Sequence, residues 1–133
     1  MSAAMAAPLL QALCVAAGSA VGALLRWRVG LWLNPAWGGF PLGTLLINAS
    51  GGLVIGAAAA WLSQRPDDLL RLLLMTGLCG GFTTFSAFSL ESLVLLQRGA
   101  FGMALVHTLA HVLGSLACAA LGWALAQAWL AAR

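Results

Sequence analysis

The chain has 133 residues, of which 62% are hydrophobic and only 7% are charged, and its six basic and three acidic residues give a net charge of +3. Soluble domains have about 25% charged residues, so this composition leaves too little polar surface to cover a globule in water. It excludes a soluble domain and predicts an integral membrane protein.

Four apolar runs lie between the charged residues, and each is long enough for the roughly 20 residues that a helix needs to cross a bilayer. The runs are continuous rather than alternating, and lipid requires every backbone group to be paired within the protein, so helices are expected. We predict an all-α membrane protein in which residues 1–133 form a single four-helix transmembrane domain. The predicted spans cover about residues 8–33, 41–62, 69–97 and 100–130.

The first span lacks the preceding basic region of a signal peptide, so we interpret it as a retained helix. A turn is predicted after it at Pro35, Gly38, Gly39 and Pro41, because proline and glycine mark the turns between helical segments.

Glycines recur four residues apart in the first three spans. The pairs are Gly18 with Gly22, Gly52 with Gly56, and Gly77 with Gly81. Small residues at this spacing let helix backbones approach closely in lipid. We therefore expect these glycines at helix–helix contacts within the bundle.

The arginines near the span ends do not select an orientation. Basic residues normally favour the cytoplasmic side, yet the two sides carry three arginines each: Arg65, Arg71 and Arg133 against Arg26, Arg28 and Arg98. Such a balance arises by chance in a chain with few charges, or because the chain inserts both ways and forms an antiparallel dimer. Charge alone leaves both explanations open. Four helices leave little room to enclose a pathway, so a transport function would favour an oligomer.

The second span has one polar face. Thr44, Asn48, Gly52 and Gly56 recur at intervals of four, which brings them to the same side of a helix. Asn48 is the amide side chain deep in this span, and an unpartnered amide in hydrocarbon costs several kcal/mol. Its side chain must therefore face a hydrogen-bond partner on another helix or a polar pathway, and both alternatives stay open.

The third span contains the sequence GGFTTFSAF at residues 80–88. Gly80 and Gly81 loosen a helix, and the hydroxyls of Thr83 and Thr84 can pair with backbone groups released by a break. We predict that this helix is broken in the middle of the membrane. A break frees carbonyl oxygens, which suit a small hard cation, and N–H groups and helix ends, which suit anions.

Aromatic and hydroxyl side chains follow this predicted break. Phe85, Phe88, Ser89 and Ser92 share a helical face, and Ser86 borders it. The edge of a phenyl ring is positive, so it can meet an anion without the full charge that would trap it. Together with the donors of the second span, this set favours a small, strongly hydrated anion in a narrow pore, although the residues alone do not name the anion.

The fourth span has a polar stripe. It consists of His107, Thr108, His111, Ser115 and Gly122. Two histidines four residues apart can ligate a metal or haem. No carboxylate or thiolate stands nearby in the sequence to complete such a site, so the pattern favours polar lining or hydrogen-bonded core histidines.

Three motifs resemble those of the Fluc (CrcB) fluoride channels of microbes, over nearly the whole chain. They are GSAVGALLRW at residues 18–27, PLGTLLIN at residues 41–48, and GGFTTFSAF at residues 80–88 followed by Glu91. The chain departs from the family pattern at Ala87, where a hydroxyl residue is common, and at His107 or His111, where a tyrosine is common.

The resemblance implies a fluoride-selective channel, not an enzyme, that exports fluoride passively across the bacterial inner (plasma) membrane. It implies an antiparallel homodimer with two fluoride pathways, and no nucleic acid or other protein partner. The pathway residues it implies are Asn48, Thr84, Phe85, Ser86, Phe88 and Ser115. It also implies a structural sodium ion at the dimer centre, held by the backbone carbonyls of Gly80 and Thr83 of both subunits. Arg26 would lie near the aqueous vestibule and Glu91 near the end of the third helix.

Two other functions fit a small four-helix membrane protein. A small multidrug exporter needs a membrane-embedded carboxylate, normally in its first helix, and the first span has none. A non-transporting accessory subunit would use the same polar stripes only to hold helices together, and this alternative stays open.

Overall fold

The computed structural model of the chain describes residues 3–34 and 40–133, and the regular structure it contains in these ranges is helical. The elements are α1 (Ala3–Leu33), α2 (Leu42–Gln64), α3 (Asp68–Arg71), the π-helix η2 (Leu72–Cys79), α4 (Gly80–Phe82), α5 (Phe85–Gln97) and α6 (Phe101–Ala131). Of the predicted turn residues, Pro35, Gly38 and Gly39 lie outside the described ranges, and Pro41 directly precedes α2.

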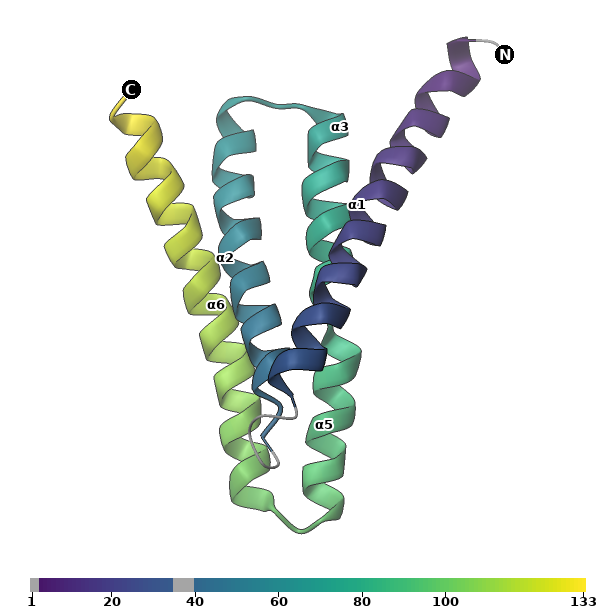
Figure 1. Cartoon of the computed structure of the whole chain (residues 1–133). Helices are drawn as coiled ribbons and strands as arrows, with labels where there is room; N and C mark the ends of the chain where they lie inside the picture. Colours follow the sequence, from purple (N-terminus) through teal and green to yellow (C-terminus); the bar gives the residue numbers. More distant parts are fainter. Residues whose placement is uncertain (1–2, 35–39) are drawn as a thin grey trace.

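Four helical stretches in the described part of the chain are long and apolar enough to cross a membrane. They are Ala7–Leu33, Leu42–Gln64, Asp68–Gln97 and Phe101–Ala131. The prediction of an all-helical protein with four candidate spans is therefore confirmed. The start of α1, the end of α6 and the connection from α2 to α3 lie toward one end of the bundle, and the α5–α6 turn lies at the other (Figure 1).

Local capping determines where the later helices begin and end. Asp67 caps α3, because its Oδ1 accepts a hydrogen bond of 2.9 Å from the Leu70 N–H, and Thr84 caps α5 in the same way with its hydroxyl. Side chains of this kind satisfy the N–H groups that a helix leaves unpaired in its first turn. Gly99 has a φ of 72° in the α5–α6 turn, a left-handed conformation that glycine adopts without steric cost.

The elements of the bundle pack closely in two places: α2 packs along α6, and α1 packs along the consecutive elements η2 and α4. Glycines form both contacts. A Cβ added at Gly52 would lie 2.6 Å from the carbonyl oxygen of Ser115, and one added at Gly81 would lie 2.8 Å from the Cα of Ser19. Gly18, Gly22, Gly56 and Gly77 meet backbone atoms of a neighbouring helix in the same way. The prediction that the glycine pairs lie at helix–helix contacts is confirmed.

Gly122→Ala is expected to destabilise the fold, because its Cβ would lie 2.9 Å from the carbonyl carbon of Leu53 on α2. Overpacking a rigid backbone contact costs about 1–3 kcal/mol, so the thermal midpoint in detergent should fall by several degrees. Gly114→Ala on the same helix is the matched control, because a Cβ there meets nothing within 4 Å. Equal midpoints for the two variants would contradict close packing of α2 on α6.

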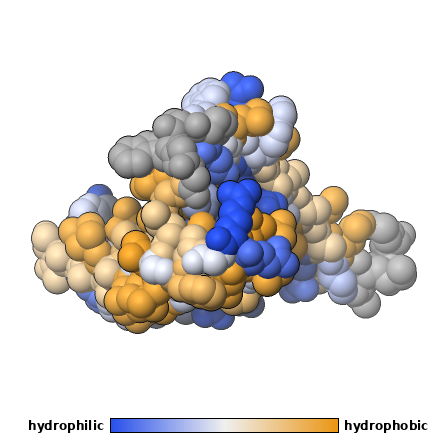
Figure 2. Space-filling view, turned by 90° about the horizontal axis from the view of Figure 1, so that it is seen from below, coloured by the Kyte–Doolittle hydropathy of each residue, from blue (hydrophilic) through white to orange (hydrophobic). Residues whose placement is uncertain are grey.

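The molecule has an apolar exterior and a partly polar interior. Large apolar side chains are exposed on every long helix, such as Leu24 at 60% and Leu116 at 66%. Seen from the end that carries the α5–α6 turn, apolar side chains cover most of the surface, and hydrophilic ones gather near its middle (Figure 2). The buried side chains include Thr44, His107 and His111. This distribution is the one expected in a bilayer, where the surroundings are as apolar as leucine.

Candidate functional site

An open groove with a volume of about 380 Å³ lies between α2, the η2–α4–α5 segment and α6. It brings together most of the predicted site residues from three of the candidate spans. Those that line it are Asn48, Gly80, Thr83, Thr84, Phe85, Phe88 and Ser115, and His111 lines it as well. Ser86 lies beside the groove, where its hydroxyl is 3.3 Å from that of Thr84.

The backbone is extended at Thr83 and Thr84, between the end of α4 and the start of α5. Both threonine hydroxyls pair with nearby backbone groups. The Thr83 hydroxyl and N–H both donate to the Cys79 carbonyl, at 2.8 and 2.9 Å, and the Thr84 hydroxyl accepts from the Ala87 N–H at 3.1 Å. The Thr83 N–H makes the ordinary helical bond to the residue four before it, whereas the Thr84 hydroxyl diverts the Ala87 N–H from its helical acceptor. Carbonyl oxygens just before Phe85 therefore lose their usual donors.

Two of those carbonyls belong to Gly80 and Thr83. The helical donor for Gly80 would be the Thr84 N–H, which instead donates to Asn48 Oδ1 at 2.8 Å. The helical donor for Thr83 would be the Ala87 N–H, which is taken by the Thr84 hydroxyl. A third carbonyl, of Gly81, accepts a hydrogen bond of 3.1 Å from Arg26 Nε on α1. Arg26 thus contacts the C-terminal end of α4. The positive guanidinium suits this position because the carbonyl end of a helix is negative.

The side chain of Asn48 pairs with both backbone groups of Thr84. Its Nδ2 donates to the Thr84 carbonyl at 3.0 Å, and its Oδ1 accepts from the Thr84 N–H at 2.8 Å. The second hydrogen on Nδ2 faces Nδ1 of His111 at 3.2 Å. Of the two alternatives left open for this amide, the structure shows hydrogen-bond partners: Thr84, in the extended segment before α5, and His111 on α6.

Aromatic rings form a stack beside this amide. The Phe88 ring centroid lies 5.3 Å from that of Phe85, 5.4 Å from that of His107 and 4.8 Å from that of His111. Phe88 is only 9% exposed, whereas Phe85 is 78% exposed. Ser89 is also exposed, donates to the carbonyl of Phe85 within its own helix and does not line the groove.

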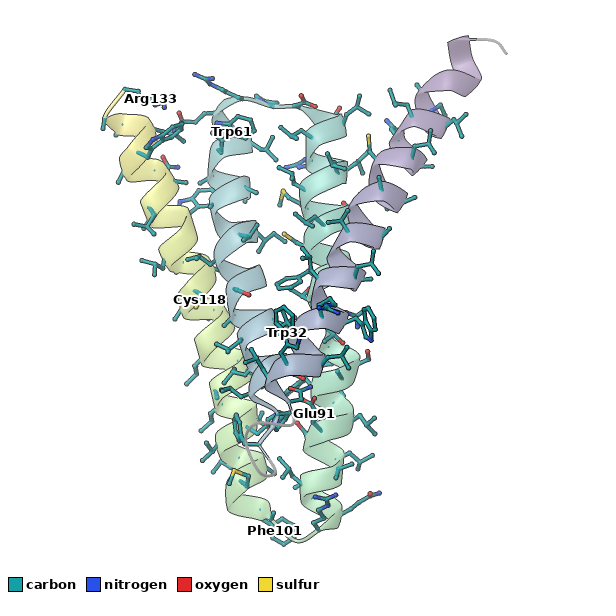
Figure 3. The ribbon with its side chains drawn as sticks, in the orientation of Figure 1. Trp32, Trp61, Glu91, Phe101, Cys118 and Arg133 are labelled. Atoms are coloured by element: carbon teal, nitrogen blue, oxygen red, sulfur yellow. The ribbon has the colours of Figure 1, made fainter. Side chains whose placement is uncertain are left out.

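Glu91 belongs to a buried polar cluster that sequence reasoning missed. Its Oε1 accepts a hydrogen bond of 2.6 Å from the Thr44 hydroxyl, and its Oε2 lies 3.4 Å from His107 Nε2. The other ring nitrogen of His107 lies 3.1 Å from the Ser92 hydroxyl. Figure 3 shows Glu91 on the side of α5 that faces α2 and α6. The sequence offered no carboxylate near the histidines, but the fold supplies one.

Once the contact between Asn48 and His111 is known, the spacing on α2 and α6 accounts for part of this cluster. Thr44 lies one turn before Asn48 on α2, and His107 lies one turn before His111 on α6. Because Asn48 and His111 meet, the preceding turns of the two helices face the same stretch of α5. Thr108, predicted in the same stripe, is half-buried.

The polar cluster lies between two hollows of the molecule. His111 lines the groove described above, and Glu91 lines a second hollow of about 310 Å³ together with Asn34 and Arg98. The rings of His107 and His111 have centroids 4.5 Å apart. Polar side chains therefore connect the two hollows through an otherwise apolar bundle.

Comparison with known proteins identifies relatives of the chain. Residues 13–123 match the family described as "CrcB-like protein, Camphor Resistance (CrcB)". A protein of Aromatoleum aromaticum named "Fluoride-specific ion channel FluC" is 50% identical over 95% of this chain and 98% of its own length. Proteins with the same name from Marinobacter nauticus and Pseudomonas aeruginosa are 51% and 52% identical, over 84% and 83% of this chain and 90% and 88% of their own lengths. The chain therefore belongs to the CrcB-like family.

Proposed function

We propose that this protein is a fluoride-selective ion channel through which fluoride leaves the cell passively. The observation that carries the proposal is the 50% identity, over 95% of the chain, to a protein named as a fluoride-specific ion channel. Since the relatives are named as channels, the function is transport rather than catalysis. The four candidate spans make the chain a multi-pass membrane protein, and the membrane we propose is the bacterial inner membrane.

The proposed pathway follows the groove. Phe85 and Phe88 would meet fluoride with their positive ring edges, and hydroxyls would donate hydrogen bonds to it. The residues of this pathway are Asn48, Thr84, Phe85, Ser86, Phe88 and Ser115, with Arg26 and Glu91 as the charged groups near its ends. The string of polar side chains between the two hollows supports a route across the bundle, because polar groups at membrane depth commonly mark ion pathways.

The functional unit we propose is an antiparallel homodimer with two pathways. Two observations support a second copy of the chain. Phe85 is 78% exposed, and Gly80 and Ser86 are exposed beside it, so the groove is open on one side of a single chain. The three arginines at each side of the predicted spans also suit insertion in both orientations. This unit needs no partner besides a second copy and the lipid bilayer.

A sodium ion at the dimer centre is part of the proposal. The carbonyl oxygens of Gly80 and Thr83 fit this role, because their helical donors are diverted to Asn48 and to Thr84. Neutral carbonyl oxygens are suitable ligands for a small hard cation. Two subunits would contribute four such oxygens, and the ion would hold the extended segments of both chains together.

Removal of sodium is expected to weaken the dimer. An ion that binds only the assembled state at about 100 times its dissociation constant contributes about 2.7 kcal/mol, so exchange into choline buffer should lower the thermal midpoint or promote dissociation. Size-exclusion chromatography and thermal melting in sodium and in choline at equal ionic strength measure this. Unchanged assembly, melting and flux in choline would contradict a bound sodium ion.

Efflux from liposomes tests the proposed function. Purified protein is reconstituted into vesicles loaded with potassium fluoride or potassium chloride, and a potassium ionophore is added to release the counter-charge. We expect rapid efflux of fluoride and none of chloride. Absence of fluoride efflux from a well-folded dimer would instead favour the accessory subunit, in which Asn48 and the histidines only join helices.

A further inference from the structure

The orientation of the Asn48 amide is determined by the backbone of Thr84. The Thr84 N–H can only donate, so the Asn48 atom 2.8 Å from it must be the oxygen. The Thr84 carbonyl can only accept, so the atom 3.0 Å from it must be the nitrogen. Exchanging the amide oxygen and nitrogen would bring two donors together and two acceptors together. Asn48 therefore presents an N–H to its third neighbour, His111.

This N–H determines which nitrogen of His111 carries the proton. Asn48 Nδ2 lies 3.2 Å from His111 Nδ1, and a donor there requires Nδ1 to accept with its lone pair. A neutral imidazole with an accepting Nδ1 has its proton on Nε2. His111 is thus held as the tautomer in which Nε2 is a hydrogen-bond donor.

The Nε2 atom of His111 is buried and has no hydrogen-bond partner among the described residues. His111 as a whole is 4% exposed and lines the groove. Ser115, one turn further along α6, also lines the groove, and its hydroxyl likewise lacks a partner in the described ranges. A buried donor without an acceptor is costly, so an acceptor is needed at this position.

We propose that His111 donates a hydrogen bond from Nε2 to the transported anion, and that Asn48 positions it by holding the required tautomer. This inference rests on the proposed fluoride channel and adds a residue to its pathway. A neutral N–H can bind an anion without the full charge that would retain it. Nε2 is shielded from bulk water. Fluoride concentrates its charge on a smaller ion than chloride does and accepts the stronger hydrogen bond, so a donor at this position favours fluoride over chloride.

The same tautomer argues against a metal site at this position. Glu91, His107 and His111 can bring one ligand atom each within 4.8 Å of the others, a donor set that suits zinc. However, a metal ligand needs a lone pair, and Nε2 of His111 carries a proton while its Nδ1 lone pair is used by Asn48. The carboxylate of Glu91 is already paired with Thr44 and faces His107.

Nitrogen NMR tests the tautomer and the contact directly. The chain has two histidines, so protein labelled with ¹⁵N-histidine and freed of any tag gives two imidazole spin systems, which His111→Gln assigns. We expect a protonated Nε2 on His111 and a shift of its signal with sodium fluoride but not with sodium chloride, with His107 as the internal reference. A proton on Nδ1, or a signal unmoved by fluoride in protein that conducts it, would overturn the proposal. So would loss of the Nε2 proton on titration with zinc.

Flux measurements distinguish a hydrogen-bond donor at His111 from a purely structural role of this side chain. Loss of one hydrogen bond to the ion should slow fluoride efflux about tenfold in His111→Leu, whereas His111→Gln retains a donor and should stay within about threefold of the parent. Leu116→Ala is the control, since Leu116 lies on the same helix, is 66% exposed and does not line the groove. Equal loss in the leucine and glutamine variants, or no loss in either, would overturn the inference. A parent protein that does not conduct fluoride would refute the channel itself, which the liposome assay detects separately.

Discussion

Replacing both Phe85 and Phe88 with isoleucine is expected to stop most fluoride flux and to leave the protein assembled. The substitution keeps apolar bulk but removes two ring edges that line the groove. If each contact contributes about 1 kcal/mol to the barrier, flux should fall at least roughly thirtyfold. Efflux from liposomes measures the rate, and size-exclusion chromatography in detergent measures assembly.

The two rings are expected to differ in what they contribute to stability. Phe85 is 78% exposed, whereas Phe88 is 9% exposed, stacks on His107 and packs at a tilt against His111. Phe88→Ile alone should therefore lower the thermal midpoint, and Phe85→Ile alone should leave it unchanged. Phe101→Ile is the control for general aromatic loss, because Phe101 is 69% exposed at the start of α6 and does not line the groove. Full flux in the assembled double variant would refute ring-edge contact with the ion.

Asn48→Ala is expected to impair both stability and flux. The variant leaves the N–H and the carbonyl of Thr84 without their partner, and Thr84 is only 8% exposed. Each unsatisfied buried group costs about 1–3 kcal/mol, so the thermal midpoint should fall by roughly ten degrees. Fluoride flux should fall by more than the loss of folded protein accounts for. The reason is that the extended segment beside the proposed fluoride pathway and the tautomer of His111 both depend on this amide.

Ser50→Ala provides the matched control for Asn48→Ala. Ser50 lies on the same helix, and within the described ranges its hydroxyl donates to carbonyls of α2, at 2.6 Å to Leu46 and 3.3 Å to Ile47. This variant should melt and conduct like the parent. If the assembled fraction of Asn48→Ala protein conducts fluoride at the parent rate, Asn48 acts only in helix packing and its place in the pathway is refuted.

Local features of the sequence predicted the helices and their close contacts. Each apolar run is bounded by charged or turn-forming residues, so the predicted span ends differ from the observed helix ends by a few residues, as at 8–33 against the helix Ala3–Leu33. Glycines four apart predicted backbone contact because their spacing alone brings them to one face. The single deep amide predicted a partner, since hydrocarbon offers none.

Pairing between distant residues could not be predicted in the same way. Glu91 and Thr44 are 47 residues apart, and Arg26 is 55 residues from the carbonyl that it contacts. Neither spacing leaves a periodic signal, because the contact depends on how two helices are rotated and shifted against each other. The carboxylate beside His107 was missed for this reason, although Glu91 and the histidines were each recognised as polar residues in a span.

The sequence by itself determined that the chain is helical, lies in a membrane and has the motifs of a CrcB-like protein, because hydrophobic length and short motifs are properties of neighbouring residues. Tertiary structure decided which polar atoms are paired and which buried ones lack a hydrogen-bond partner among the described residues. Asn48 meets Thr84 across 36 residues and His111 across 63. Only that three-way contact selects the tautomer of His111, since the choice between two ring nitrogens depends on which donor or acceptor lies within hydrogen-bond distance.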